Sequence, residues 1–174
     1  LTKPIGIQAI MAAYRILKDF PEMLEQYSKD ELKKSINFAI KIMTTSNQDV
    51  VKTIHSYSDF SFIHAMSDVT GFGLSGHTKE MLQNSNLSAV LEKIPAIKLS
   101  QELSSELGYA FNDCTCHETA GGMLMAVDPV KAEEFSDTLY SNGIKNWIIG
   151  TIDSLKPRTV RVDENKEIIE IQNL

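Results

Sequence analysis

The chain has 174 residues, which suits one domain with its own core, and its 43% hydrophobic and 23% charged residues are typical of a globular protein rather than a disordered one. The net charge of −6 argues against general nucleic-acid binding, which needs a basic surface, but a bound cation would still admit a phosphate-bearing ligand. Two cysteines are too few for a disulfide framework and indicate a reducing, intracellular setting, and no apolar run is long enough to span a membrane.

Helices are predicted in the first third of the chain. Apolar residues at helical spacing predict a first helix over 5–20. A second helix is expected over 28–47, with Ser28 as its N-cap and Glu31, three residues later, as the capping-box partner. A shorter third helix is expected over 48–57.

Strands and helices alternate through the rest of the chain. Short apolar runs bounded by polar turns predict buried strands over 60–66 and 121–127. Further elements are expected as strands over 87–94 and 146–152 and as helices over 74–85, 98–111 and 129–143. The segments 158–163 and 166–172 are predicted to form a hairpin around the sequence DENK. The pattern predicts an α/β fold of the α+β type, in which helices cover a mixed β-sheet.

The sequence SDVTGFGLSGH places a carboxylate and two glycines between a predicted strand and a predicted helix. The first backbone N–H groups of a helix attract anions, and Gly71 and Gly73 allow a sharp bend and the close approach of a ligand. Because an ionised Asp68 would repel a phosphate, a cation such as Mg²⁺ has to lie between them. The functional interpretation is a metal-phosphate site with Asp68 as a metal ligand.

A structural explanation competes with this interpretation. Asp and Thr commonly cap helices and initiate turns, so Asp68 or Thr70 is suited to cap a helix that begins near Phe72. From the residue types alone, the helix cap is the default.

A second glycine turn lies in the sequence CTCHETAGGMLMAV. Glu118 and Thr119 are suited either to bind a ligand or to order their own turn, and the structural role is favoured. Cys114, Cys116 and His117 provide one half of a zinc site without a second half, so zinc is not expected. No neighbouring cation in the sequence would activate either thiol.

The other histidines indicate no site. His64 lies in an apolar run and is expected to be a core histidine with its polar atoms paired. His77 and Glu80 are one helical turn apart and are expected to lie on a solvated helix face.

Four motifs in order resemble one known family. The segment SDVTGFGLSGHTKEM is similar to the Thr-Asp-(Val/Ile)-Thr-Gly-Phe-Gly-(Leu/Ile)-Leu-Gly-His segment of selenophosphate synthetase, or selenide, water dikinase. LTKPIGIQ resembles the start of that family's second domain, and CHETAGGMLMAV resembles its Cys-Pro-Glu-Thr-Ser-Gly-Gly segment. WIIGTID and RTVRVDENKEIIEI resemble the family's C-terminal end, so the resemblance covers essentially the whole chain.

The resemblance implies a fold, a reaction and a site. It implies a fold like the C-terminal domain of aminoimidazole ribonucleotide synthetase, with residues 1–174 as one domain of a longer, two-domain enzyme. The family makes selenophosphate from selenide and ATP with Mg²⁺, releases AMP and phosphate, and is expected to work as a cytoplasmic homodimer. Its magnesium-binding aspartate falls on Asp68. Thr70, Gly71 and Gly73 match the same motif and are expected next to the ATP phosphates.

The resemblance also implies what this chain does not supply. The family's reactive Cys or selenocysteine, its catalytic Lys and its other magnesium carboxylates lie in an N-terminal domain. No catalytic residue is therefore expected here, and the isolated domain is expected to be inactive. Ser67, Ser75, His117 and Ala120 depart from the usual residues and indicate a divergent member. The alternatives are a regulatory paralogue or binding module, or another kinase or cyclo-ligase of the same superfamily.

Overall fold

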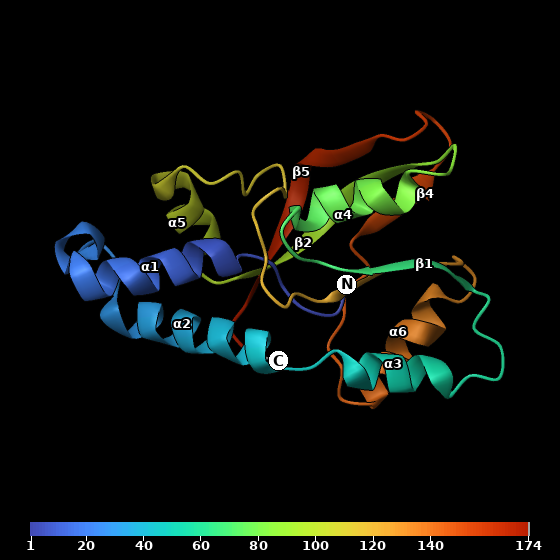
Figure 1. Cartoon of the computed structure of the whole chain (residues 1–174), viewed down its shortest axis with the longest axis horizontal. Helices are drawn as coiled ribbons and strands as arrows, with labels where there is room; N and C mark the ends of the chain where they lie inside the picture. The colour runs from blue at the N-terminus through green and yellow to red at the C-terminus, as the bar shows by residue number, and fades with distance from the viewer. Residues whose placement is uncertain (174) are drawn as a thin grey trace.

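The computed structural model of the protein describes residues 1–173, in which helices and strands interleave (Figure 1). The helices are α1 (Ile7–Asp19), η1 (Pro21–Leu24, a 3-10 helix), α2 (Lys29–Thr44), α3 (Gln48–His55), α4 (Gly73–Leu82), α5 (Ser100–Leu107) and α6 (Ala132–Ser141). The strands are β1 (Ile63–Asp68), β2 (Ser88–Ile97), β3 (Met123–Val127), β4 (Gly150–Asp153) and β5 (Val160–Ile171). The predicted mixed fold is confirmed, with the strands divided between two sheets.

Helices α1, α2 and α5 enclose one part of the core. α1 and α2 lie side by side (Figure 1), and Ile10, Leu32 and Ile42 are fully buried in the cluster between these helices. The predicted cap of α2 is confirmed, because the Ser28 side chain accepts a hydrogen bond from the backbone N–H of Glu31 at 3.5 Å. These contacts bury the apolar stripe that the sequence pattern predicted.

A three-stranded sheet has the order β4-β2-β5. β2 is its central strand, antiparallel to β4 and parallel to β5. β2 also continues through Pro95 to Ile97, beyond the predicted end of that strand. Backbone groups at this end of β2 form hydrogen bonds with Ile5. The N–H of Ile5 donates to Pro95 O at 2.9 Å, and the carbonyl of Ile5 accepts from Ile97 N–H at 2.9 Å.

The predicted C-terminal hairpin around DENK is wrong. Residues 160–171 form one strand, β5, that runs parallel to β2 on both sides of the DENK sequence. The register moves from Leu91 opposite Val162 to Lys93 opposite Glu167, so residues 163–166 bulge out of the ladder instead of reversing the chain. Within the bulge, the backbone N–H of Asn165 donates to Asp163 Oδ1 at 2.8 Å. The Asp and Asn residues of this sequence therefore form a local turn contact, but the contact stabilises a bulge and not a hairpin.

β1 and β3 form a separate two-stranded antiparallel sheet. Both segments were expected to be buried strands, and this is only partly correct. Along β1, half-buried residues alternate with exposed ones, and in β3 only Leu124 is fully buried. His64 lies on the exposed side of β1, so the expectation of a core histidine is wrong. Successive side chains of a strand point to opposite faces of the sheet, and one face of β1 is open to solvent, which explains the exposure of His64.

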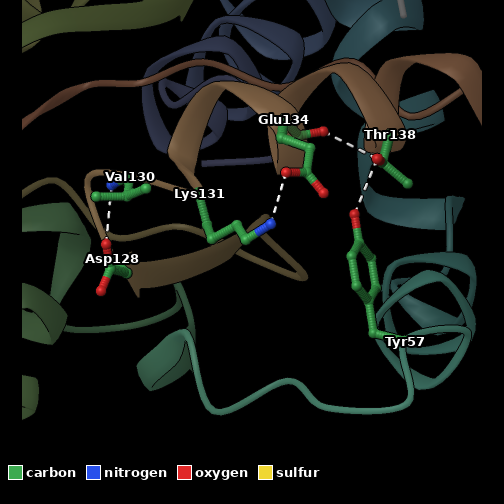
Figure 2. A network of polar contacts seen from close by, with 6 residues as sticks. All are labelled: Tyr57, Asp128, Val130, Lys131, Glu134 and Thr138. Atoms are coloured by element: carbon green, nitrogen blue, oxygen red, sulfur yellow. Dashed lines mark hydrogen bonds and ion pairs between the residues drawn. The ribbon is translucent and has the colours of Figure 1, made fainter.

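Helices α3 and α6 pack together near the two-stranded sheet, and a small apolar cluster joins them to it. Figure 2 shows the polar contacts that accompany this packing. The Tyr57 hydroxyl donates to Thr138 Oγ1 at 2.9 Å, and Thr138 in turn donates to the carbonyl of Glu134 at 2.9 Å. Lys131 Nζ lies 2.7 Å from Glu134 Oε2 at the start of α6. The segment that follows α3 is therefore tied to α6 by the Tyr57 side chain.

Residues 1–6 connect the two sheets before α1 begins. Thr2 bonds to Met123 of β3 through both its backbone N–H, at 3.2 Å, and its hydroxyl oxygen, at 2.8 Å. Ile5 bonds to β2, as described above. This segment fixes the place of β3, and through it the place of β1, which carries the candidate site. In the described part of the chain, no helix is long and apolar enough to cross a membrane.

Candidate functional site

Asp68 is the last residue of β1 and pairs with Met123 of β3. Its side chain is exposed, and its carboxylate makes no hydrogen bond or ion pair with the residues that the structure describes. The chain reverses direction directly after it, through the turn Val69–Phe72, and enters α4 at Gly73. The fold therefore presents the Asp68 carboxylate to solvent with all its acceptor positions free.

The helix-cap explanation of Asp68 and Thr70 does not hold. Phe72 occupies the N-cap position of α4, and no side chain makes a capping hydrogen bond there. The Thr70 hydroxyl instead lies 3.1 Å from His77 Nε2. Asp68 makes no contact with the first turn of α4 that would explain its presence as a cap. The structure thus removes the default role that the residue types suggested.

Backbone donors accumulate in this turn. Within the described residues, the N–H groups of Thr70, Gly71 and Phe72 donate to no carbonyl or side chain of the protein. Gly71 and Phe72 are exposed, so these donors face water. Three successive free N–H groups in the turn that leads into α4 provide donors that can bind an anion such as a phosphate.

The expected solvated face is confirmed for Glu80, whose side chain is 51% exposed, but is wrong for His77, whose side chain is only 8% exposed. His77 Nδ1 lies 2.8 Å from Glu80 Oε2, and Nε2 is hydrogen-bonded to the Thr70 hydroxyl at 3.1 Å. His77 therefore holds Thr70 from within α4. The sequence analysis missed this pairing, although Thr70 and His77 are only one strand-to-helix turn apart.

The two glycines of the turn differ in their surroundings. Gly73 is buried and has φ +69°, and a Cβ there would lie 2.7–2.8 Å from the backbone of residues 114–116. Gly71 is exposed, and a Cβ there would meet nothing within 4 Å. Packing against the neighbouring loop therefore explains Gly73. Nothing within the chain requires a glycine at position 71.

This difference predicts opposite outcomes for two matched substitutions. Gly73→Ala is expected to lower the free energy of unfolding by roughly 3 kcal/mol, because the methyl group meets backbone atoms and the backbone is left-handed. Gly71→Ala is expected to change it by less than about 0.5 kcal/mol. Urea unfolding of both variants measures this, and equal effects of the two substitutions would contradict the assignment.

Glu118 belongs to the second glycine turn, and its carboxyl group is buried. It lies next to the turn that follows Asp68. Its exposed fraction is 5%, and its two oxygens accept the backbone N–H groups of Gly6 at 2.7 Å and Ile7 at 3.0 Å. Its own backbone N–H donates to the carbonyl of Thr70 at 3.0 Å. The structural role favoured for Glu118 is confirmed, since the side chain caps α1 from another part of the chain.

Burial raises the pKa of Glu118 to about 8, and the two backbone N–H donors oppose that rise. Because the folded protein holds this proton more tightly than the unfolded chain does, the contribution of Glu118 to stability is fully present below pH 4.5 and is lost as the pH rises towards 8. A complete shift of this size corresponds to roughly 3–5 kcal/mol.

The corresponding prediction compares the protein with its Glu118→Gln variant. The difference in unfolding free energy between the two should change in favour of the glutamine variant between pH 5 and 8, that is, across roughly the window between the free and folded pKa values. Chemical unfolding at several pH values measures this difference and cancels the contribution of other groups. A difference that stays constant with pH would contradict the assignment.

Cys114 and Cys116 lie beside Gly73 and Glu118, and both are buried free thiols. Burial raises the pKa of Cys114 to about 12 and that of Cys116 to about 11. Thiols in this state carry little thiolate at neutral pH and are poor nucleophiles. The structural use of this loop is its backbone, because the carbonyl of Cys114 accepts the N–H of Ser75 in α4 at 2.9 Å.

The candidate site offers one metal ligand. In residues 1–173, no group of three or more His, Cys, Asp or Glu side chains comes together in a way that could hold a metal ion. Mg²⁺ commonly uses one or two carboxylates together with water and phosphate oxygens. A free, exposed carboxylate next to free backbone donors fits one position of such a metal-phosphate site, and the other protein ligands would have to come from elsewhere.

A family model described as "AIR synthase related protein, C-terminal domain" matches residues 5–163. The chain belongs to this family. The expected aminoimidazole ribonucleotide synthetase-like fold is thereby confirmed. The matched residues include both glycine turns, strands β1 to β4 and the first residues of β5.

The resemblance to selenophosphate synthetase is confirmed by relatives that carry its name. A selenide, water dikinase of Methanococcus maripaludis is 32% identical over 98% of this chain and 52% of its own length. A second, from Methanocaldococcus jannaschii, is 39% identical over 80% of this chain and 39% of its own length. Selenide, water dikinase 2 of Homo sapiens is 29% identical over 98% of the chain. The chain spans about half the length, or less, of these family members.

Solved structures of more distantly similar proteins have the same fold. Escherichia coli HypE, a hydrogenase maturation protein, superposes with a TM-score of 0.62 at 19% identity and covers 92% of this chain and 44% of its own. A structure of HypE in complex with ATP has a TM-score of 0.55 at 17% identity over 71% of this chain and 39% of its own. At these identities, the similarity establishes the architecture of the family domain alone.

Proposed function

We propose that this chain is the C-terminal domain of a selenide, water dikinase. In this proposal, the full-length protein uses ATP and Mg²⁺ to convert selenide into selenophosphate and releases AMP and phosphate. The relatives named above support the reaction, and their greater length supports a second domain. The observation that carries the site is the free carboxylate of Asp68 next to the N–H groups of Thr70, Gly71 and Phe72, which have no partner among the described residues.

Each residue of the turn has a defined part in the proposal. Asp68 would supply one oxygen ligand to Mg²⁺, and the ion would neutralise charge on the ATP phosphates during phosphoryl transfer. The N–H groups of Thr70, Gly71 and Phe72 face the phosphate oxygens, and the absence of a side chain at Gly71 leaves room for them. Gly73 acts at a distance, because it lets α4 pack on residues 114–116 and so aims the turn.

The reacting groups come from outside this chain. One exposed carboxylate cannot position a nucleotide for reaction, so the N-terminal half of the full-length protein supplies the nucleophile, the catalytic lysine and the remaining metal ligands. The working enzyme is a cytoplasmic homodimer, and this domain alone is expected to hydrolyse little or no ATP. Substantial Mg²⁺-dependent hydrolysis by residues 1–174 alone would contradict this division of labour.

The experiment that tests the function follows the products of the full-length protein. With ATP, Mg²⁺ and selenide under anaerobic conditions, phosphorus NMR should detect selenophosphate, and chromatography should detect equal amounts of AMP. Omission of selenide should stop selenophosphate formation. ADP as the only nucleotide product, with no dependence on selenide, would indicate a different kinase or a cyclo-ligase of the same superfamily. Absence of all turnover would indicate a regulatory paralogue.

A further inference from the structure

The feature that the proposed site leaves unused is the loop of residues 118–122. It lies directly behind the Asp68 turn and touches it at two points. The backbone N–H of Val69 donates to Gly122 O at 3.0 Å, and the N–H of Glu118 donates to Thr70 O at 3.0 Å. The two residues that follow Asp68 are thus both hydrogen-bonded to this loop.

The contact between the loop and the turn is also close in space. A Cβ at Gly121 would lie 2.3 Å from the carbonyl oxygen of Val69, and one at Gly122 would lie 2.4 Å from the backbone nitrogen of Lys3. Backbone lies against backbone on both sides of the loop. A displacement of the loop would therefore move Val69 and Thr70 with it, because no flexible side chain separates them.

The loop is anchored on its other side by the Glu118 side chain. The first turn of α1 has no side-chain cap of its own, and Gly6 at its N-cap has φ +112° and a position for Cβ that Ser100 fills. The Glu118 oxygens replace that cap, with one oxygen on Gly6 N–H and the other on Ile7 N–H. The loop of residues 118–122 is thereby attached to the N-terminus of α1.

We infer that Glu118 is a positioning residue for the Asp68 turn, which it holds in place by anchoring the loop of residues 118–122 to the N-terminus of α1. The inference rests on the proposed function, since it assigns to Asp68 the role of metal ligand. Glu118 itself is buried and touches neither metal nor substrate. Its effect reaches the metal through the backbone of Thr70 and Val69.

The test uses the full-length protein and its Glu118→Gln variant. The assay is run above pH 8, where Glu118 is ionised and both of its oxygens accept. Glutamine has nearly the same size, but it offers one oxygen and one N–H₂ group to the two backbone N–H groups. The lost hydrogen bond is expected to raise the Mg²⁺ concentration for half-maximal ATP turnover by about tenfold. Turnover at saturating Mg²⁺ should fall much less. A residue with a purely structural role would lower stability without this change in the Mg²⁺ requirement.

Two comparison variants make the result specific. Leu103→Ala, in the core between α1 and α5, should destabilise the protein while leaving the Mg²⁺ requirement unchanged. Asp68→Asn is measured beside it and should lose Mg²⁺-dependent turnover. If Asp68→Asn is active, the proposed site is wrong. If Asp68→Asn is inactive while Glu118→Gln keeps the normal Mg²⁺ requirement, the positioning role is wrong and the site stands.

Hydrogen exchange gives a second readout that does not depend on catalysis. In Glu118→Gln, the amides of Val69 and Glu118 should exchange at least several-fold faster, while the amides of α2 remain as protected as before. Unchanged exchange at these two amides would overturn the inference. Glu118→Asp, which keeps the carboxylate but shortens its reach, is the second variant for the same measurements if Glu118→Gln does not fold, with the same expected changes and the same contradicting result.

Discussion

Replacing Asp68 by asparagine in the full-length protein is expected to reduce Mg²⁺-dependent ATP turnover by about 100-fold or more. Asparagine retains the size of the side chain but removes the negative charge that the metal requires. The free energy of unfolding should stay within about 0.5 kcal/mol of the original value, because the Asp68 carboxylate makes no contact with the described residues that the fold would lose. Steady-state kinetics and urea unfolding of the same preparations measure both quantities.

The control for this substitution is Asp137→Asn. Asp137 is an exposed aspartate on α6, outside the candidate site, and its replacement should leave turnover and stability unchanged. Near-normal turnover of the Asp68→Asn protein would contradict the metal role. A large loss of stability in that protein would contradict the assignment of Asp68 as a residue that the fold does not use.

Replacing Lys3 by methionine is expected to lower the free energy of unfolding by roughly 3–5 kcal/mol. Lys3 is only 4% exposed, and burial lowers the pKa of its amino group. Its Nζ donates to three carbonyls, those of Thr45 at 2.6 Å, Ala120 at 2.9 Å and Ile42 at 3.3 Å. Two of these carbonyls lie at the C-terminal end of α2, where the helix dipole favours a cation. Methionine would fill the space but leave the carbonyls of Thr45 and Ala120 without this donor, whereas the carbonyl of Ile42 would keep the N–H of Thr45.

The matched control is Lys41→Met, in the last turn of α2. Lys41 is exposed, so its replacement should change the free energy of unfolding by less than about 0.5 kcal/mol. Thermal and urea unfolding of the two variants compare a buried lysine that contacts the C-terminal end of α2 with an exposed lysine in the last turn of that helix. Similar values for Lys3→Met and Lys41→Met would show that the three hydrogen bonds of Lys3 contribute little.

Local signals in the sequence predicted most helices because each helix has a stripe of apolar residues and recognisable ends. Ser28 and Glu31 marked the start of α2, and Gly108, with φ +73°, follows the end of α5. Strand pairing depends on contacts between distant segments, which local patterns do not contain. The sequence DENK therefore looked like a hairpin turn, although both of its flanks pair with β2.

In the candidate site, too, the sequence identified the residue with a local signal and missed those that depend on distant contacts. Asp68 was recognisable because a carboxylate, two glycines and a change from strand to helix pattern are adjacent in the sequence. The capping role of Glu118 depends on Gly6 and Ile7, more than a hundred residues away, so no local pattern identifies its partners. His77 was assigned to a solvated face, because helical spacing shows which residues are neighbours and not which side the core covers.

The most direct test of the metal role is a metal-substitution experiment on Asp68→Cys in the full-length protein. A thiolate is a poor ligand for Mg²⁺ and a good one for softer ions such as Cd²⁺. The account predicts that ATP turnover of Asp68→Cys is lost with Mg²⁺ and partly restored when Cd²⁺ is added, whereas Cd²⁺ gives no such gain in Asp68→Ala. Turnover of Asp68→Cys that remains normal with Mg²⁺ alone would contradict the claim that Asp68 binds the metal.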